Sequence, residues 1–566
     1  MDRRVFFAAA LAAVLALAGC TSVPSADHFD VVIRGGTVFD GTGAPGRVAD
    51  VGIVGDRIKA IGDLSGAGAD RTIEARGMAV APGFINVLSW ANESLLDDGR
   101  SQSDIRQGVT LEVMGEGDSM GPLNDTMKAE MAKLQSDIKY DVSWTTLGQY
   151  LELLERRGVS TNVASFVGAA TVRAHVVGLD NDKATAGQLA EMQELVRAAM
   201  REGALGVGSS LIYAPGSFAD TEDLVALTAA AHEFGGGYIS HIRSEADRFL
   251  EAVDELIEIG RRTGAPVQMY HMKPAGKKNW HKSQAAIDRL NAARAKGIDV
   301  SANIYPYTAG ATGLDASMPL WVQEGGLDAW VARLKKPDVR KRVIREMRGK
   351  PKGWESLYQA AGSADKVILI AFKNAKLKPL TGKTLAEVSR LRGTSPEETM
   401  IDLVIEDNSR VGTAYFVMDE KNIRRNIAWP WTAVGSDAES LAPEGVFLES
   451  NPHPRAYGAF ARFLAKYVRD EKVISLAEGV RRMTGLPAKQ LRLKDRGHLA
   501  AGYMADVVVF DAEKIQDHAT FANPHQYSTG VSHVFVNGVQ VLRDGEHTDA
   551  RPGRVVRGPG WTGGGR

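Results

Sequence analysis

The chain has 566 residues, a formal net charge of -1 and 44% hydrophobic residues. This composition is sufficient for a large core and for more than one domain. A net charge close to zero gives no support to a nucleic-acid partner, because a surface that binds nucleic acid needs an excess of basic residues. The 60 glycines are spread along the chain without a repeat period, which indicates many tight turns rather than a repeat architecture.

Residues 1–20 have the features of a targeting signal. Two arginines near the start precede an apolar stretch at residues 5–17 that is too short to span a bilayer comfortably. The stretch ends in LAGC (17–20), which resembles the lipobox of bacterial lipoprotein signals. A single cysteine is also compatible with a buried core residue or a free thiol, but the position of Cys20 favours lipidation. We therefore expect a lipid-anchored protein of the bacterial cell envelope, facing the periplasm, with neither a free thiol nor a disulfide.

The two ends of the chain are rich in predicted β-structure. Alternating apolar residues and glycine pairs predict strands within residues 30–61, 505–511 and 532–545. Asn537-Gly538 is typical of a two-residue hairpin turn. We expect these segments to form a small β-sheet.

The middle of the chain, residues 81–490, alternates apolar strand-like runs with amphipathic helical patterns. Eight buried strands with helices between them are typical of a (β/α)8 barrel, so the predicted fold class is α/β. Residues 315–430 are too long for a simple crossover and form an insertion with a basic stretch, interpreted as a solvated helix face. The predicted strands are Ala79–Leu88, Thr110–Gly115, Asn162–Val167, Leu205–Leu211, Gly237–His241, Val267–His271, Asp299–Tyr305 and Thr432–Asp437.

Four residues with metal-binding or acid–base side chains lie at the predicted strand ends. Glu116 follows the second strand, His241 ends the fifth, His271 ends the sixth and Asp437 ends the eighth. Catalytic groups of such barrels lie at this end of the strands. Glu116 and the two histidines offer three ligands to a divalent ion, Zn²⁺ being the natural choice, and leave a position for water. Asp437 is then placed to accept the proton of that water.

Each of these residues also has an ordinary structural interpretation. A single histidine at a strand end is more often a hydrogen-bonded structural residue. Glu116 in its Gly-Glu-Gly turn is compatible with a solvated side chain, and Asp437 with a helix N-cap. The joint placement of the four residues at one end of the predicted barrel favours the metal site.

Stretches spread from about residue 29 to 550 match a known family: DVVIRGGTVFDGTG, PGFINV, QGVTLEVMGEG, SSLIYAPG, SHIRSE, HMKPAG, IYPYTAG, VGSDA, HPRAYGAF and RGHLAAGYMADVVVFD. Together they resemble the N-acyl-D-amino-acid deacylase (D-aminoacylase) branch of the amidohydrolase superfamily. The resemblance implies a metal-bearing (β/α)8 barrel beside a small β-sandwich built from residues 21–80 and 491–566. It also implies hydrolysis of the amide bond of an N-acyl-D-amino acid or a similar small acylated amino acid.

The first barrel strand departs from this family. The family has Asp-x-His-x-His after Pro-Gly-Phe-Ile, whereas residues 86–90 here read NVLSW. Leu88 and Trp90 cannot bind a metal, so we expect one Zn²⁺ rather than two. Glu116 stands where D-aminoacylases have a cysteine ligand, and its oxygen is a competent substitute. A Glu/His/His set is similar to that of the N-acetylglucosamine-6-phosphate deacetylases of the same superfamily.

Further positions match family residues near the substrate. The resemblance implies that Arg455 and Lys273 hold the substrate carboxylate. It places Tyr213 and Tyr305 near the scissile amide, with Tyr305 as a donor to the carbonyl oxygen. A family serine that helps to hold the carboxylate falls at Ala311. Surface ion pairs and core aromatic residues are equally compatible with these four side chains.

Two other functions stay open from the sequence. The altered first strand and Ala311 are compatible with a hydrolase of dipeptides or cyclic amides. Loss of the first-strand histidines is compatible with a catalytically inactive, ligand-binding lipoprotein, although retention of Glu116, His241, His271 and Asp437 argues against it. In each case we expect a small-molecule partner, no nucleic acid, and membrane contact through the lipid anchor alone.

Overall fold

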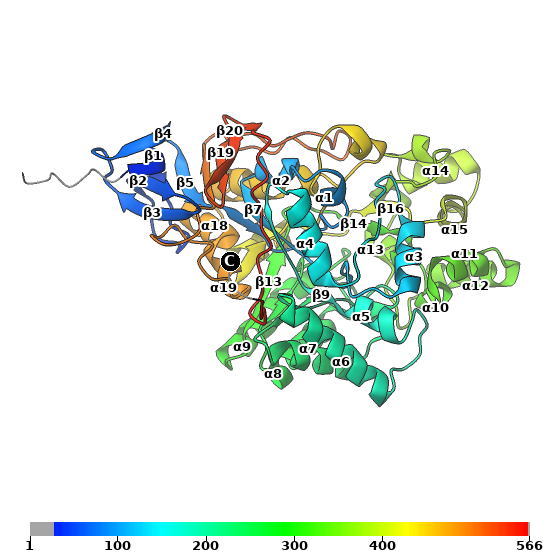
Figure 1. Cartoon of the computed structure of the whole chain (residues 1–566). Coiled ribbons are helices and arrows are strands. Elements are labelled where there is room, and N and C mark those ends of the chain that lie inside the picture. The colour runs from blue at the N-terminus through cyan, green and yellow to red at the C-terminus, as the bar shows by residue number, and fades with distance from the viewer. Residues whose placement is uncertain (1–27, 564–566) are drawn as a thin grey trace, which may run out of the picture.

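The computed structural model describes residues 28–563. It contains a sheet built from both chain ends, a (β/α)8 barrel, and an insertion of helices and a short sheet (Figure 1). In Figure 1 the terminal sheet lies at the upper left, barrel helices lie at the bottom and the insertion lies on the right. Cys20 and the rest of the predicted signal lie outside the described residues.

One nine-stranded sheet joins the two ends of the chain. Its strands are β1 (His28–Val38), β2 (Arg47–Val54), β3 (Arg57–Gly62), β4 (Gly68–Glu74), β5 (Ala79–Pro82), β18 (Val507–Phe510), β19 (Val531–Val536), β20 (Val539–Arg543) and β21 (Glu546–His547). β1 pairs with β4 before an irregularity at Ile33–Gly36 and with β5 after it. This change of partner lets the sheet close around its own apolar core as a small β-sandwich.

The predicted hairpin turn is confirmed. Asn537 (φ 50°) and Gly538 (φ 80°) connect β19 to β20, and two consecutive positive φ values are the signature of the turn that Asn-Gly favours. A Cβ atom at position 538 would lie 1.9 Å from the carbonyl oxygen of Gly55. Only glycine fits there, so the turn also fixes the approach of the C-terminal hairpin to the N-terminal strands.

Eight parallel strands form the barrel, the short β8 and β9 acting as one strand. They are β6 (Phe84–Asn86), β7 (Val109–Met114), β8 (Asn162–Ser165) with β9 (Val167–Gly168), β10 (Gly206–Ser210), β11 (Gly237–His241), β12 (Val267–Met269), β13 (Val300–Ile304) and β17 (Thr432–Val434). A parallel bridge between Ser89 and Ala438 connects the first strand to the last. The backbone N–H of Asp437 also donates to the carbonyl of Leu88 at 2.8 Å. The ends of these two strands are therefore adjacent.

The expectation of a single first strand over Ala79–Leu88 was wrong. β5 pairs with β1 and β18 in the terminal sheet, and only β6 belongs to the barrel. The chain changes sheets at Gly83, whose hypothetical Cβ would lie 2.1 Å from Oγ1 of Thr110. The close approach of the backbone to β7 requires a glycine, and the preceding Pro82 cannot donate a ladder hydrogen bond.

Helices surround the barrel and begin at recognisable sequence signals. Thr185 with Gln188, and Asp220 with Asp223, form capping boxes at the starts of two of them. The helices are α4 (Leu147–Arg157), α5 (Ala169–Val176), α6 (Ala186–Arg201), α7 (Thr221–His232), α8 (Phe249–Thr263), α9 (Ser283–Ala295), α16 (Glu420–Ala428), α17 (Arg455–Arg462), α18 (Leu476–Met483) and α19 (Gly485–Gln490). The helices α1 (Ser94–Asp97), α2 (Gln102–Ile105) and α3 (Asp125–Leu134) follow the first two strands.

The insertion between β13 and β17 has its own secondary structure. Its antiparallel sheet has the order β14 (Gly310–Gly313), β16 (Gly412–Tyr415), β15 (Val367–Ala371), and its helices are α10 (Leu320–Gln323), α11 (Gly326–Leu334), α12 (Pro337–Arg348), α13 (Leu357–Ala361), α14 (Leu385–Arg392) and α15 (Pro396–Asp407). The basic stretch lies on α12, which buries Val343 and Met347 and exposes Arg342 and Arg348. This is the arrangement expected of a solvated helix face.

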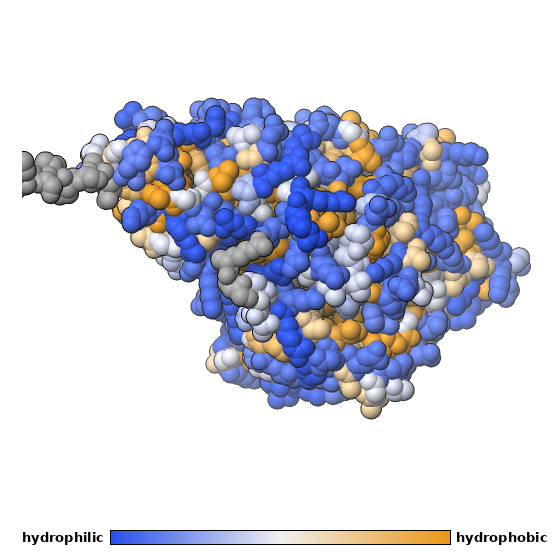
Figure 2. Space-filling model, in the orientation of Figure 1, coloured by the Kyte–Doolittle hydropathy of each residue, from blue (hydrophilic) through white to orange (hydrophobic). Residues whose placement is uncertain are grey.

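The visible surface of the molecule is mainly hydrophilic, with scattered hydrophobic patches (Figure 2). Apolar atoms contribute to every protein surface, so scattered patches carry no functional meaning by themselves. Within residues 28–563, no helix combines the length and the apolar character needed to cross a membrane.

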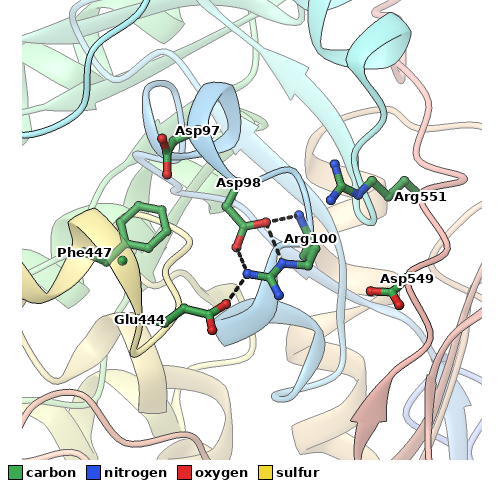
Figure 3. A pocket seen from close by; sticks show the side chains of 8 residues that line it. Asp97, Asp98, Arg100, Glu444, Phe447, Asp549 and Arg551 are labelled. Atoms are coloured by element: carbon green, nitrogen blue, oxygen red, sulfur yellow. Dashed lines mark hydrogen bonds and ion pairs between the residues drawn. The ribbon is translucent and has the colours of Figure 1, made fainter.

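Arg100 connects two loops at the edge of the barrel (Figure 3). Its Nε and Nη2 atoms each lie 2.9 Å from an oxygen of Asp98, and the same guanidinium pairs with Glu444. The planar fork suits such a double contact. Arg100 thereby joins the segment after β6 to the segment after β17, beside a cavity of about 570 Å³ that Phe447 also lines.

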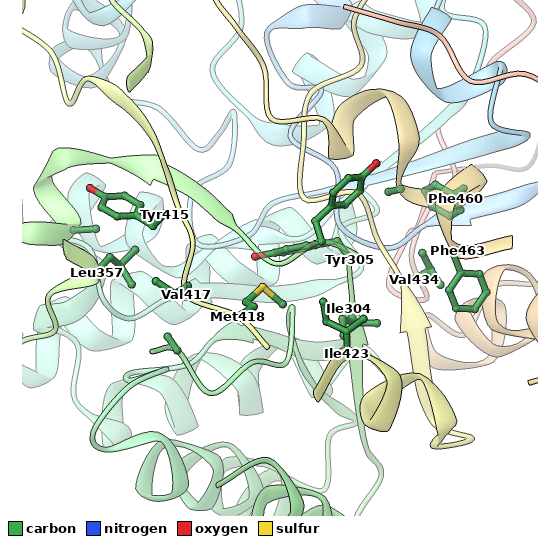
Figure 4. Close-up of a cluster of buried hydrophobic side chains, with 14 of the residues drawn as sticks. Ile304, Tyr305, Leu357, Tyr415, Val417, Met418, Ile423, Val434, Phe460 and Phe463 are labelled. Carbon is green, nitrogen blue, oxygen red and sulfur yellow. The ribbon is translucent and has the colours of Figure 1, made fainter. Parts of the chain in front are cut away.

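The insertion shares its hydrophobic core with the barrel. In Figure 4, Tyr305 at the end of β13 lies between Val434 and Phe460 on one side and Val417 and Met418 on the other. All five side chains are buried and belong to one apolar cluster. The insertion is therefore packed against the carboxyl end of the barrel, where the predicted site residues lie.

Candidate metal centre

The structure brings Glu116, His241 and His271 together. Their candidate ligand atoms all lie within 4.8 Å of one another, and each residue is no more than 5% exposed. Nε2 of His271 lies 2.8 Å from Oε1 of Glu116, and Nδ1 of His241 lies 3.8 Å from the same oxygen. Glu116 is thus not the solvated turn residue that its sequence context also allowed.

The backbone at these positions is specialised. Gly115 and Gly117 flank Glu116 with positive φ values of 97° and 81°, and a Cβ atom at either would lie less than 2.5 Å from a neighbouring strand. His271 (φ 34°) and Asp437 (φ 53°) also have positive φ, which is costly for residues other than glycine. Such strain persists only where the surrounding structure holds it, and it is concentrated at functional sites.

The residues fit a bound divalent ion. Nε2 of His241 is buried and makes no hydrogen bond to any described residue, and Oε1 of Glu116 lies beside imidazole nitrogens of His271 and His241. Buried polar atoms without partners are costly, so they indicate a missing partner. One carboxylate oxygen and two imidazole nitrogens are the donor set of a catalytic Zn²⁺ site with an open position.

Glu245, which was not among the predicted site residues, contacts Lys273 and His271 on the side of His271 that faces away from Glu116. Its Oε1 accepts a hydrogen bond from Nζ of Lys273 at 2.5 Å and lies 2.9 Å from Nδ1 of His271. Burial would raise the pKa of Glu245, but the charge of Lys273 and the neighbouring imidazoles lower it. A carboxylate on Nδ1 orients the other ring nitrogen, Nε2, toward a metal. The available sequence signal was a glutamate four residues after His241.

The charges around His271 favour a positive charge in the site. Burial and Lys273 would lower the pKa of His271, but the carboxylates of Glu116 and Glu245 raise it to about 9. Lys273, only 6% exposed, lies 2.7 Å from Nδ1 of His271. In this structure Lys273 contacts the supporting side chains, and its predicted contact with a substrate carboxylate stays a prediction.

Asp437 lies between two hydrogen-bond donors. Its Oδ2 is 2.7 Å from Nη1 of Arg455, and its Oδ1 accepts from the indole Nε1 of Trp90 at 3.1 Å. The same indole nitrogen donates to Oε2 of Glu116 at 3.2 Å. From the sequence, Trp90 was only a lost metal ligand; the structure shows it in direct contact with two of the predicted site residues.

The two predicted tyrosines border the site. The ring of Tyr213 lies 5.4 Å from that of His241, and the ring of Tyr305 lies 6.3 Å from that of His271. The Tyr305 hydroxyl is buried and has no hydrogen-bond partner within residues 28–563. Burial raises the pKa of Tyr305, so its hydroxyl stays protonated and can donate a hydrogen bond.

Charged side chains from three loops lie near the site. Asp118 and Glu439 are solvent-accessible, yet desolvation raises the pKa of each. Arg410, from the insertion, lies 4.9 Å above the Tyr213 ring and pairs with Asp315 at 2.8 Å. The insertion therefore contributes a wall near Tyr213.

Known proteins are similar to this chain over most of its length. Residues 71–542 match the model of the amidohydrolase family. The chain is 34% identical to D-aminoacylase of Alcaligenes xylosoxydans xylosoxydans over 93% of its own length and 97% of that protein. It also resembles the crystal structure of N-acyl-D-glutamate deacylase from Bordetella bronchiseptica, complexed with zinc and a phosphonate inhibitor that mimics the reaction's tetrahedral intermediate. The TM-score is 0.78 at 31% identity, covering 94% of this chain and 100% of that one.

A D-aminoacylase structure, described in terms of one-metal activation and second-metal attenuation of a binuclear centre, gives a TM-score of 0.77. Its identity is 33%, covering 94% of this chain and 100% of that one. The family match and the identity both extend over most of the sequence. The protein is therefore a member of the amidohydrolase family, with the barrel and β-sandwich of its D-aminoacylase-like branch.

Proposed function

We propose that the protein is a metal-dependent amidohydrolase that hydrolyses the amide bond of N-acyl-D-amino acids or similar small acylated amino acids. The observation that carries this proposal is the buried Glu116, His241 and His271 set beside Asp437 at the carboxyl end of the barrel. The relatives named D-aminoacylase, N-acyl-D-glutamate deacylase and N-acyl-D-aspartate deacylase support the substrate class.

The metal would be held by Glu116, His241 and His271. A bound Zn²⁺ supplies Lewis acidity and lowers the pKa of water in such sites. We propose one ion, because Leu88 and Trp90 offer no ligand in the first strand. For the structurally similar D-aminoacylase, one metal is described as activating and a second as attenuating, which supports a single-ion enzyme.

Asp437 and Tyr305 carry the proposed chemistry of the protein itself. A carboxylate oxygen of Asp437 accepts the proton of the attacking water and later delivers it to the leaving nitrogen. The unpartnered hydroxyl of Tyr305 donates to the carbonyl oxygen as negative charge develops there. Both steps require the scissile amide to lie between these two side chains.

Arg455 is the proposed anchor of the substrate carboxylate. The residue is 4% exposed, and its Nε makes no hydrogen bond to the residues that the structure describes. Its guanidinium lies 4.5 Å above the ring of Tyr305, so it faces the place where the amide would sit. Bidentate binding of a carboxylate by arginine fixes both position and orientation.

The cellular location is also a proposal. Residues 1–20 carry a basic start, an apolar stretch and the LAGC sequence, which together support export and lipidation of Cys20. We propose that the enzyme is held by this lipid at the bacterial envelope and acts on small molecules of the periplasm.

One experiment tests the proposed reaction. Purified protein is analysed for bound metal and then assayed for amine release from N-acyl-D-amino acids, N-acyl-L-amino acids and dipeptides. We expect close to one ion per chain and preferential cleavage of the D-series. Metal-loaded protein that releases no amine from any of these compounds would contradict the proposal; cleavage of dipeptides alone would change the substrate class.

A further inference from the structure

The indole N–H of Trp90 lies between two buried carboxylates of the candidate site. Nε1 is 3.2 Å from Oε2 of Glu116 and 3.1 Å from Oδ1 of Asp437. Glu116 and Asp437 are 4% and 8% exposed. A single donor therefore contacts both a proposed metal ligand and the proposed proton acceptor, although the two residues come from opposite parts of the chain.

The backbone holds the indole in this position. The N–H of Trp90 donates to the carbonyl of Ala438 at 3.0 Å, and the N–H of Ser89 donates to the carbonyl of Val113 at 2.8 Å. The hydroxyl of Ser89 also donates to Glu112 at 2.8 Å. The segment carrying Trp90 is thus attached to the second and the eighth barrel strands, which deliver Glu116 and Asp437.

The shared N–H distinguishes between the two oxygens of Glu116. Oε2 accepts from the indole, whereas Oε1 lies 2.8 Å from Nε2 of His271 and 3.8 Å from Nδ1 of His241. Hydrogen bonds to a ligating carboxylate fix which oxygen binds the ion. The hydrogen bond from Trp90 thereby orients Glu116 so that Oε1 faces the two histidines and Oε2 faces the indole.

Charge balance argues against a second cation in the space that the indole fills. Among the groups in direct contact, three carboxylates (Glu116, Glu245 and Asp437) face two cations (Lys273 and Arg455). One divalent ion already makes this set positive, so a further ion would be repelled in a buried environment. A neutral N–H satisfies the carboxylates without adding charge.

We infer that Trp90 is a positioning residue. Its N–H restricts Glu116 to one ligating oxygen and holds Asp437 beside the Glu116, His241 and His271 set. The inference rests on the proposed function in that it assigns Trp90 to the same site. The competing interpretation is that Trp90 only packs against its neighbours, since its ring also contacts an apolar cluster.

Trp90→Phe separates these interpretations, because it keeps an aromatic ring and removes the N–H. Trp90→Gln restores an N–H donor without adding an imidazole ligand and serves as the rescue variant. The matched control is Trp321→Phe, which removes an indole N–H that donates to Glu346 at 2.8 Å in the insertion. Melting temperatures of the variants show whether each one is folded.

The first readout uses Co²⁺ as a spectroscopic probe of the metal site. We expect Trp90→Phe to change the visible absorption of the Co²⁺ protein and to weaken Co²⁺ binding by about tenfold, the usual effect of losing a hydrogen bond to a charged group. We expect kcat to fall on the order of tenfold with little change in KM, and Trp90→Gln to recover part of the loss. Trp321→Phe should change neither the spectrum nor kcat.

The second readout does not depend on metal or activity. In protein with ¹⁵N-labelled tryptophan, the indole resonance that is present in wild type and missing from Trp90→Phe belongs to Trp90. We expect this resonance to lie downfield in wild type and to move in Asp437→Asn. If this resonance is insensitive to Asp437→Asn, or if Trp90→Phe matches Trp321→Phe in spectrum and kcat, the inference is wrong. A normal resonance response in a protein that cleaves no amide would instead contradict the proposed function alone.

Discussion

Arg455 and Asp437 form a buried ion pair, with Nη1 of the arginine 2.7 Å from Oδ2 of the aspartate. The two residues were expected to have separate roles, one holding the substrate carboxylate and the other moving a proton. Their contact couples these roles. If Arg455 binds the substrate carboxylate as proposed, that carboxylate would compete with Asp437 for the same guanidinium and would free an oxygen of Asp437 for proton transfer.

The first prediction concerns Arg455. Arg455→Met should raise KM for an N-acyl-D-amino acid on the order of 100-fold, because a charge-assisted bidentate contact is lost. The matching substrate with a neutral terminal amide should be affected much less. Arg462→Met is the control, since Arg462 lies on the same helix, pairs with Asp517 at 3.1 Å and covers the ring of Tyr307. Equal losses with both substrates would mean that Arg455 does not bind the carboxylate.

The second prediction separates metal binding from proton transfer. His271→Ala should lower metal content and turnover together, because two protein ligands hold an ion poorly. Asp437→Asn keeps its shape but accepts no proton, so it should retain most of the metal and lose about 10²–10⁴ in turnover. Elemental analysis and steady-state kinetics give both quantities. If Asp437→Asn loses the metal as completely as His271→Ala, Asp437 is a principal ligand and another group moves the proton.

The third prediction concerns metal number. Wild-type protein dialysed against excess Zn²⁺ and then against buffer should retain close to one tightly bound ion per chain. Removal of that ion by a chelator should abolish amine release, and one equivalent of Zn²⁺ should restore it. Two tightly bound ions by elemental analysis would show that groups other than Leu88 and Trp90 rebuild a second site.

The fourth prediction links stability to pH through Glu112. Burial raises the pKa of Glu112 to about 7, and its oxygens accept hydrogen bonds from Ser89 and Thr161 at 2.8 Å. Between the ordinary glutamate pKa of 4.5 and about 7, the unfolded chain loses a proton that the folded chain keeps. Stability from this group is therefore complete below the lower value and lost as pH rises through the higher one, by about 3 kcal/mol.

Glu112→Gln removes this titration. The apparent melting temperature of the variant should fall less than that of wild type between pH 5 and pH 8, while Glu152→Gln, at an exposed position on α4, should follow wild type. Parallel pH dependence in wild type and Glu112→Gln would show that Glu112 does not keep its proton in the folded state.

The fifth prediction concerns the anchor. Cys20→Ser should yield unprocessed or soluble precursor, because the residue proposed to carry the lipid is lost. Cell fractionation and metabolic labelling with a fatty acid measure the outcome. A variant that still fractionates as a mature, lipid-labelled membrane protein would show that the LAGC sequence is not the lipidation site.

Sequence patterns located most barrel strands and the residues at their ends, because hydrophobic runs and their succession along the chain can be read directly from the sequence. The partners of those residues are not local. Glu245 contacts Lys273 and His271 through the register of two neighbouring strands, and no sequence spacing specifies that contact. Trp90 was interpreted only as the loss of a metal ligand, because an indole does not bind metal. Its hydrogen bonds depend on the closure of the barrel, which places the first and last strands side by side.

The break at Gly83 was missed for a related reason. Residues 79–88 form one continuous apolar run, and a buried strand of the terminal sheet has the same composition as a buried strand of the barrel. Only the tertiary pairing of β5 with β18 separates the two. Hydrophobic periodicity therefore predicted that the segment is extended and buried, but not to which sheet it belongs.

The pairing of β5 with both β1 and β18 determines when the terminal sheet can form during synthesis. β5 is made early in synthesis, yet one of its two neighbours begins at Val507. The edge of β5 stays open until nearly the whole chain has emerged, and the residues around Val555 that pair with Val163 come later still. Contacts of such long sequence separation form slowly. The chain therefore remains without its finished terminal sheet throughout synthesis, and the barrel strands are made before the sheet that joins the two ends is complete.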